Sequence, residues 1–142
     1  MTPYIPKHFV LQEWLPKDFY NQNKGLGDKL WLMFDDRILW TYDKLRKRYG
    51  KIIINDWLWE GHNQYRGWRP FDCPVGAKLS QHKFGRAGDG IFEKFTAEEV
   101  RQDILKHQND YDFQYISVIE GNVSWLHCDC RNIVPGKGIV LI

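Results

Sequence analysis

Apolar positions recur at helical spacing in the first third of the chain and predict helices there. The densest stretch, residues 27–49, has enough apolar positions for a buried or broadly amphipathic helix, which Gly50 would end. A shorter helix is expected over residues 8–15, because Pro16 cannot continue it. The N-terminal part of the chain is therefore expected to be helical.

Later in the chain the pattern changes to short apolar runs typical of strands. These runs are residues 51–59, 90–95, 113–120, 123–131 and 138–142, the last as an edge strand. Gly121 and Asn122 lie between two of them and are typical of a two-residue hairpin turn. Thr96 and Glu99 form a capping box that begins a helix running to about His107.

Residues 60–79 separate the first two predicted strands and are rich in glycine and proline. A loop of this length in a compact domain usually has a function. Helices followed by a mostly antiparallel sheet indicate an α+β fold. The 142 residues are the size of one domain, so we expect a single domain over residues 1–142.

Composition narrows the class of protein. The chain is 43% hydrophobic and 27% charged, which is typical of a globular protein. Its net charge is +2 and its basic residues are scattered, so we expect no nucleic-acid partner. No run approaches ~18 apolar residues, so no membrane span is expected. Three cysteines without a signal peptide indicate synthesis in a reducing cytoplasm, with Cys128 and Cys130 buried as free thiols.

The segment Ser-Gln-His-Lys-Phe-Gly-Arg-Ala-Gly-Asp places His82 and Asp89 on either side of small residues. Small residues let the backbone turn sharply, so both side chains can converge on one point. Imidazole nitrogen and carboxylate oxygen are both good zinc ligands. Taken alone, however, such a pair also occurs by chance.

The segment Trp-Leu-His-Cys-Asp predicts a strand with two different faces. Trp125, His127 and Asp129 would share one face, while Leu126 and Cys128 would point into the core. An imidazole and a carboxylate on the first face are typical of a strand that lines a site. His127 is thus a plausible third ligand, although a single histidine on a strand is more often only hydrogen-bonded.

A third segment, Arg-Gly-Trp-Arg-Pro, lies in the long loop and contains Arg66 and Arg69. An arginine fork can hold a carboxylate or stabilise a developing oxyanion. A solvated arginine on an exposed loop is the alternative interpretation.

In this order and spacing, Gly-Trp-Arg-Pro, Ser-Gln-His-x6-Asp and Trp-Leu-His-x-Asp resemble the M15 zinc peptidases of the hedgehog/DD-peptidase superfamily, and most closely their small phage or prophage members. The resemblance covers residues 56–132. It implies a small sheet that carries one zinc ion. It also implies cleavage of peptidoglycan stem peptides, either as a D-Ala-D-Ala carboxypeptidase or as an endolysin-type endopeptidase, and the sequence leaves that choice open.

The resemblance also implies roles for individual residues. His82, Asp89 and His127 match the three zinc ligands of the family, leaving a fourth position for water. Arg69 matches the arginine that steadies the oxyanion or a substrate carboxylate. Further candidates for substrate binding are Arg66, Trp68 and Gln81.

The general base departs from the family pattern. Many members place a glutamate three residues before the last histidine, where this chain has Ser124. Glu120 is our candidate, Asp129 is its rival, and a chain with no competent base is the third possibility. In an ideal hairpin Glu120 would face Val123, about 13 Å along the strand from His127. A bulge or a wider turn would be needed to bring it closer.

Two other functions fit the same sequence. One is a non-catalytic zinc-binding recognition module, which the serine in place of the usual glutamate favours. The other is a structural part of a virion. A lytic enzyme made in the cytoplasm of a bacterium or a phage-infected host would also have to reach the cell wall, for example through a phage pore.

Overall fold

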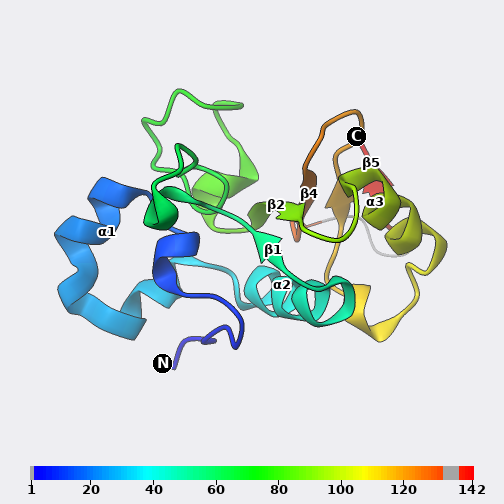
Figure 1. Cartoon of the computed structure of the whole chain (residues 1–142), viewed down its shortest axis with the longest axis horizontal. Helices are drawn as coiled ribbons and strands as arrows, with labels where there is room; N and C mark the ends of the chain where they lie inside the picture. The colour runs from blue at the N-terminus through cyan, green and yellow to red at the C-terminus, as the bar shows by residue number, and fades with distance from the viewer. Residues whose placement is uncertain (1, 133–137) are drawn as a thin grey trace.

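A five-stranded sheet with the order β1-β2-β4-β3-β5 lies at the centre of the fold (Figure 1). The computed structural model describes residues 2–132 and 138–142. The strands are β1 (Ile52–Ile53), β2 (Ala87–Phe92), β3 (Val118–Ile119), β4 (Leu126–Asp129) and β5 (Val140–Leu141). Neighbouring strands are antiparallel except β3 and β5, which are parallel. The expected α+β class and the mostly antiparallel sheet are confirmed.

Helices precede the sheet and connect its strands along the chain. The α-helices of the described residues are α1 (Lys17–Asn23), α2 (Asp36–Tyr49) and α3 (Ala97–Lys106). Short 3-10 helices cover Leu11–Glu13, Lys24–Met33, Trp57–Trp59, Gln81–Phe84 and Tyr111–Phe113. None of the helices in the described part of the chain is long and apolar enough to cross a membrane.

The single helix predicted over residues 27–49 is wrong, because the chain breaks before Asp35. This residue caps α2: its carboxylate accepts a hydrogen bond from the backbone N–H of Arg37 at 3.0 Å. Gly27, with φ of 57°, interrupts the 3-10 helix that precedes the break. Apolar side chains continue across both pieces, so hydrophobic spacing alone did not reveal the interruption.

Other predicted elements are present but shorter or shifted. Of residues 8–15 only Leu11–Glu13 is helical, and β2 begins three residues before the predicted segment 90–95. The predicted strands 51–59 and 113–120 each contain only two strand residues, together with a whole 3-10 helix in the first and the end of one in the second. Their apolar residues are held by other contacts; for example, Trp57 Nε1 donates to the carbonyl of Leu15 at 2.8 Å. The capping box is confirmed, and residues 60–79 contain no helix or strand.

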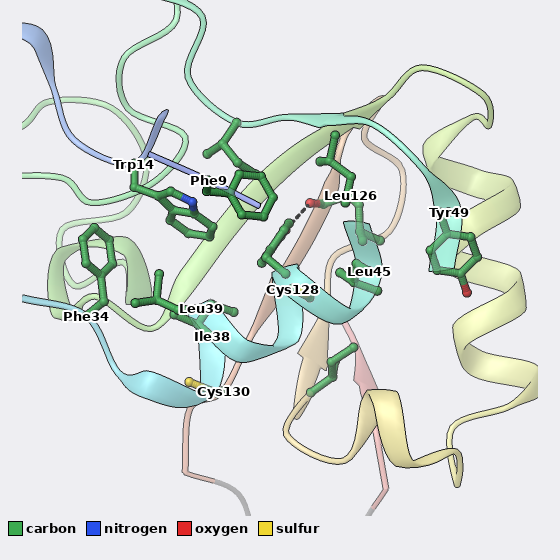
Figure 2. Packing of buried hydrophobic residues seen from close by; sticks show 14 of the residues in the cluster. Phe9, Trp14, Phe34, Ile38, Leu39, Leu45, Tyr49, Leu126, Cys128 and Cys130 are labelled. Atoms are coloured by element: carbon green, nitrogen blue, oxygen red, sulfur yellow. Dashed lines mark hydrogen bonds between the residues drawn. The ribbon is translucent and has the colours of Figure 1, made fainter. Parts of the chain in front are cut away.

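Helix α2 packs against one face of β2 and β4 and forms much of the core (Figure 2). Leu126 and Cys128 of β4 point to this helix and are fully buried, as the alternation of the strand predicted. The Tyr42 hydroxyl of α2 donates to the carbonyls of Gly88 at 2.6 Å and Leu126 at 3.1 Å. The helix is thus tied directly to both strands. The segment 60–79 lies on the other side of the strands (Figure 1).

The three cysteines, Cys73, Cys128 and Cys130, are free and buried, as was expected for the last two.

Candidate metal centre

Two of the predicted ligands are direct partners on neighbouring strands. Asp89 of β2 is paired with His127 of β4, and their side chains leave the sheet on the face opposite α2. His82 reaches them from the 3-10 helix Gln81–Phe84, immediately before β2. Asp89 Oδ1 lies 2.8 Å from His127 Nδ1 and 3.2 Å from His82 Nε2. The structure therefore brings together the three side chains that the sequence singled out.

Local contacts fix the orientation of the His82 ring. The hydroxyl of Ser80 accepts a hydrogen bond from the backbone N–H of His82, which caps the short helix. His82 Nδ1 lies 2.7 Å from the carbonyl oxygen of Gly67, to which it can donate, so Nε2 faces Asp89 with its lone pair. Gly67 itself packs on the backbone of Trp14 so closely that a Cβ would overlap the Trp14 carbonyl. This explains the glycine in Gly-Trp-Arg-Pro.

The turn between His82 and Asp89 also depends on one glycine. Gly85 ends the 3-10 helix with φ of 67°, a left-handed conformation that glycine adopts without strain. A Cβ at this position would also overlap the carbonyl of Met33. The chain can therefore reverse into β2 and present Asp89 beside His82.

A second carboxylate holds the His127 ring from behind. His127 Nε2 lies 3.0 Å from Asp129 Oδ2, and Asp129 is fully buried. Arg131 donates to both oxygens of Asp129, from Nε at 2.8 Å and from Nη2 at 2.5 Å. A carboxylate that accepts from the far nitrogen of a histidine fixes its tautomer and leaves the near nitrogen to bind a metal. Asp129 thus has the contacts of an orienting group rather than those of a free base.

The electrostatics of the cluster follow from these contacts. Burial alone would lower the pKa of His127, but hydrogen bonds to Asp129 and Asp89 outweigh it and raise the pKa to about 9. Burial would raise the pKa of Asp89, but hydrogen bonds from His127 and His82 hold it below its usual range. A metal ion requires the neutral imidazole, so it would take the place of a proton between these side chains.

The donor set fits a metal ion. One ligand atom from each of His82, Asp89 and His127 lies within 4.8 Å of the other two, and all three residues are buried. Imidazole nitrogens and a carboxylate oxygen are typical ligands of zinc, and a set of three leaves one position open. The cluster could therefore hold one metal ion.

Arg69 lies beside the cluster, and each of its three side-chain nitrogens donates a hydrogen bond. Its Nη2 donates to Asp89 Oδ2 at 3.2 Å, and its Nε donates to the carbonyl of Tyr65 at 2.6 Å. Its Nη1 donates to the carbonyl of Val75 at 3.5 Å. Because Arg69 holds one oxygen of Asp89, the other oxygen is left facing the two histidines.

Glu120 is the cross-strand neighbour of His127 at the edge of β4 that pairs with β3, opposite the edge that pairs with β2. Its backbone N–H donates to the carbonyl of His127 at 3.2 Å, which continues the register of Ile119 with Cys128. The predicted two-residue turn is therefore wrong. The chain makes a wider turn through Asn122, which has φ of 58°, and this turn removes the expected separation between Glu120 and His127.

Arg101 of α3 explains the wide turn. Its guanidinium is fully buried and donates to the carbonyls of Glu120 at 2.9 Å, and of Val123 and Trp125 at 3.1 Å each. It also pairs with the carboxylate of Glu98. The Arg101 side chain thus donates hydrogen bonds to three backbone carbonyls. In a tight hairpin these carbonyls would have had other partners.

A cavity of about 500 Å³ opens over the cluster. Its lining includes the three ligands and Glu120, together with Arg69, Gln81, Trp125 and Arg131, and apolar side chains of the loop 60–79. Gln81 Oε1 is buried there without a hydrogen-bond partner among the described residues. Gln81 therefore keeps its place as a candidate for contact with substrate.

The other two substrate-binding candidates do not line this cavity. Arg66 Nη1 donates to the carbonyl of Ile54 at 3.4 Å, and the ring of Trp68 packs on Phe19 with centroids 4.7 Å apart. Both residues hold the long loop in place.

Sequence reasoning missed two arginines. Arg131 continues the alternation of Trp125, His127 and Asp129, so the period of the strand could have found it. The role of Arg101 depends on contacts distant in sequence, and no local pattern indicates it.

Comparison of the chain with models of known protein families, with curated proteins and with solved structures found no match.

Proposed function

We propose that this protein is a zinc-dependent peptidase that cleaves stem peptides of bacterial peptidoglycan. One observation carries the proposal: Asp89 and His127 are partners on neighbouring strands, and Glu120, directly after β3, pairs with His127 from its other side within one cavity. With His82 they combine a metal-ligand set and an additional carboxylate, which are the parts that a metallopeptidase requires.

The chemistry divides between the metal and the protein. A zinc ion held by the three ligands would lower the pKa of its bound water and polarise the scissile carbonyl. Glu120 accepts the proton of the attacking water and delivers it to the leaving amine. Its carboxylate is not tied to any of the described residues by a hydrogen bond, unlike that of Asp129. Glu120 is therefore the better of the two candidate bases.

The remaining side chains position the reacting groups. Asp129 and the carbonyl of Gly67 hold the two histidine rings, each by the nitrogen that faces away from Asp89. Arg69 holds Asp89 and places a positive charge at the wall of the cavity, where it favours the negative charge that develops on the substrate oxygen.

The substrate class rests on the resemblance of the three motifs to the M15 peptidases, and membership of the hedgehog/DD-peptidase superfamily is part of the proposal. The cavity supports it in one respect: cations and apolar residues lie together in its lining, as a short peptide with polar ends would require.

The test is direct. The purified protein is loaded with zinc, its metal content is measured, and peptidoglycan is digested while mass spectrometry follows the released fragments. New peptide termini at one zinc per chain would support the proposal. Intact muropeptides at full zinc occupancy would contradict it.

Intact muropeptides would favour the second candidate function, a zinc-binding recognition module without catalysis. The observation behind that alternative is Ser124, which stands where many relatives of the proposed family have their glutamate.

A further inference from the structure

Arg131 presents a positive charge to the cavity from the same side of the chain as His127 and Asp129. Its guanidinium lines the cavity, and its side chain is 35% exposed. It lies two residues beyond the end of β4, so the strand that supplies a candidate metal ligand also determines where this charge lies.

Only one edge of this guanidinium is used. Asp129 accepts from Nε and Nη2, which form one side of the planar fork. The Nη1 group makes no hydrogen bond to any of the residues that the structure describes. The edge formed by Nη1 and Nη2 therefore has donors left over, in the arrangement that binds a second carboxylate through two parallel hydrogen bonds.

Arg69, the other arginine of the cavity, is not available in this way. All three of its nitrogens donate to protein oxygens, and its side chain is only 10% exposed. Of the two arginines in the lining, Arg131 is thus the one with a nitrogen that donates to none of the described residues, and its side chain is the more exposed.

We propose that Arg131 binds the C-terminal carboxylate of the substrate, which would make the enzyme a carboxypeptidase. This inference rests on the proposed peptidase function and specifies its substrate. The carboxylate of a terminal residue lies one residue beyond the scissile carbonyl, about 3.8 Å along the chain. Asp129 connects Arg131 to His127 through two hydrogen bonds, so the carboxylate site and the metal site are neighbours.

Matched substrates provide the test. Peptides ending in D-Ala-D-Ala are offered as the free acid and as the C-terminal amide, and kcat/KM is measured for both. The zinc-loaded protein should prefer the acid by about 10- to 100-fold, the size expected for a charge-assisted hydrogen-bonded pair. In Arg131→Gln the ratio of the two rates should fall towards one. Arg131→Lys, which keeps the charge but loses the fork, should be intermediate and provides the test should the glutamine variant not fold.

Arg86→Gln is the matched control, because it removes the same charge from a residue that does not line the cavity.

A second readout does not depend on turnover. Calorimetry should show acetyl-D-alanine binding to the zinc-loaded protein more tightly than its amide does, with the difference lost in Arg131→Gln.

The outcomes separate the two proposals. If the zinc-loaded protein cleaves neither peptide nor peptidoglycan, the peptidase function itself is wrong. If it cleaves acid and amide equally, or if Arg131→Gln slows both to the same extent, the peptidase stands. Arg131 then only supports Asp129, and the carboxylate site is refuted.

Discussion

Glu120 and His127 face each other across β3 and β4, joined by a hydrogen bond from the Glu120 N–H to the His127 carbonyl at 3.2 Å. Residues opposite each other in an antiparallel pair point to the same face of the sheet. The pairing therefore places a carboxylate beside a candidate metal ligand although the two are seven residues apart. A tight hairpin at Gly121-Asn122 would have separated them, so the width of one turn decides whether this carboxylate lies beside the histidine.

Replacement of Glu120 is the first prediction. Glu120→Gln keeps the shape of the side chain but removes its ability to accept a proton. We expect turnover to fall by about 10²- to 10⁴-fold, the usual contribution of a general base, while bound zinc is unchanged. Metal analysis and peptide hydrolysis measure the two effects separately. Ser124→Ala is the control, since this residue has no role in the proposed mechanism, and retained activity in Glu120→Gln would show that the base is elsewhere.

The second prediction concerns Arg101. In Arg101→Met the three carbonyls that bind the guanidinium lose their donor, and an unsatisfied buried carbonyl costs ~1–3 kcal/mol. We expect a loss of about 3 kcal/mol in the free energy of unfolding, measured by urea denaturation. Because the turn then relaxes, activity should fall even where the variant is fully folded. Arg37→Met, which removes an arginine half exposed on α2, should be much milder.

Removal of the carboxylate behind His127 is the third prediction. Asp129→Asn should weaken zinc binding by about 10- to 100-fold, the usual effect of losing such a partner of a metal ligand. Competition with a chelator of known affinity measures this directly. Asp112→Asn, in which the altered carboxylate pairs with Arg48 away from the cavity, should leave zinc affinity unchanged. Equal affinities in the two variants would show that Asp129 does not orient His127.

The fourth prediction is a dependence of stability on pH at the start of α2. Hydrogen bonds from Arg37 hold the pKa of Asp35 below its usual value near 3.8. A carboxylate with a lowered pKa stabilises the fold above the unfolded value, and this contribution is lost as the pH falls through the folded pKa. Asp35→Asn keeps a good helix cap but removes the charge. At pH 7 this substitution should lower the free energy of unfolding by less than about 1 kcal/mol, because the ion pair between Asp35 and Arg37 is partly exposed.

As the pH falls through the lowered pKa of folded Asp35, the wild type and Asp35→Asn should converge in stability. Asp35→Ala should remain about 1 kcal/mol less stable than the asparagine variant at every pH, because it also lacks the cap. Urea titrations at several pH values measure both differences. A constant gap between wild type and Asp35→Asn down to low pH would contradict the assigned cause.

The sequence predicted the residues of the candidate metal centre more accurately than the bounds of the helices and strands. His82, Asp89 and His127 were singled out because three short motifs, in their order and spacing, resemble those of a known family of zinc peptidases. The local patterns, small residues at a turn and alternating faces on one strand, were each weak signals when taken alone. The break before Asp35 and the shortness of β1 and β3 were missed, since the apolar residues around them are buried by distant contacts rather than by the predicted elements.

The turn after Glu120 shows why the remainder could not be predicted. Gly121 and Asn122 favour a tight hairpin by their own conformational preferences. The buried charge of Arg101, about twenty residues earlier in the chain, overrides that preference by binding the carbonyls of a wider turn. The conformational preferences of Gly121 and Asn122 predict the turn that these residues would form alone. In the folded protein the wider turn is stabilised because its carbonyls bind Arg101.

The hydroxyl of Tyr42 links the interior of the protein to its candidate metal centre. It binds the carbonyls of Gly88 and Leu126, the residues immediately before Asp89 and His127. The two strands that bear the candidate ligands are therefore also held together from the far side of the sheet, by the seating of α2. Metal capture and core packing should act as one cooperative unit, in which loading the ion slows hydrogen exchange in β2, β4 and the middle of α2 together.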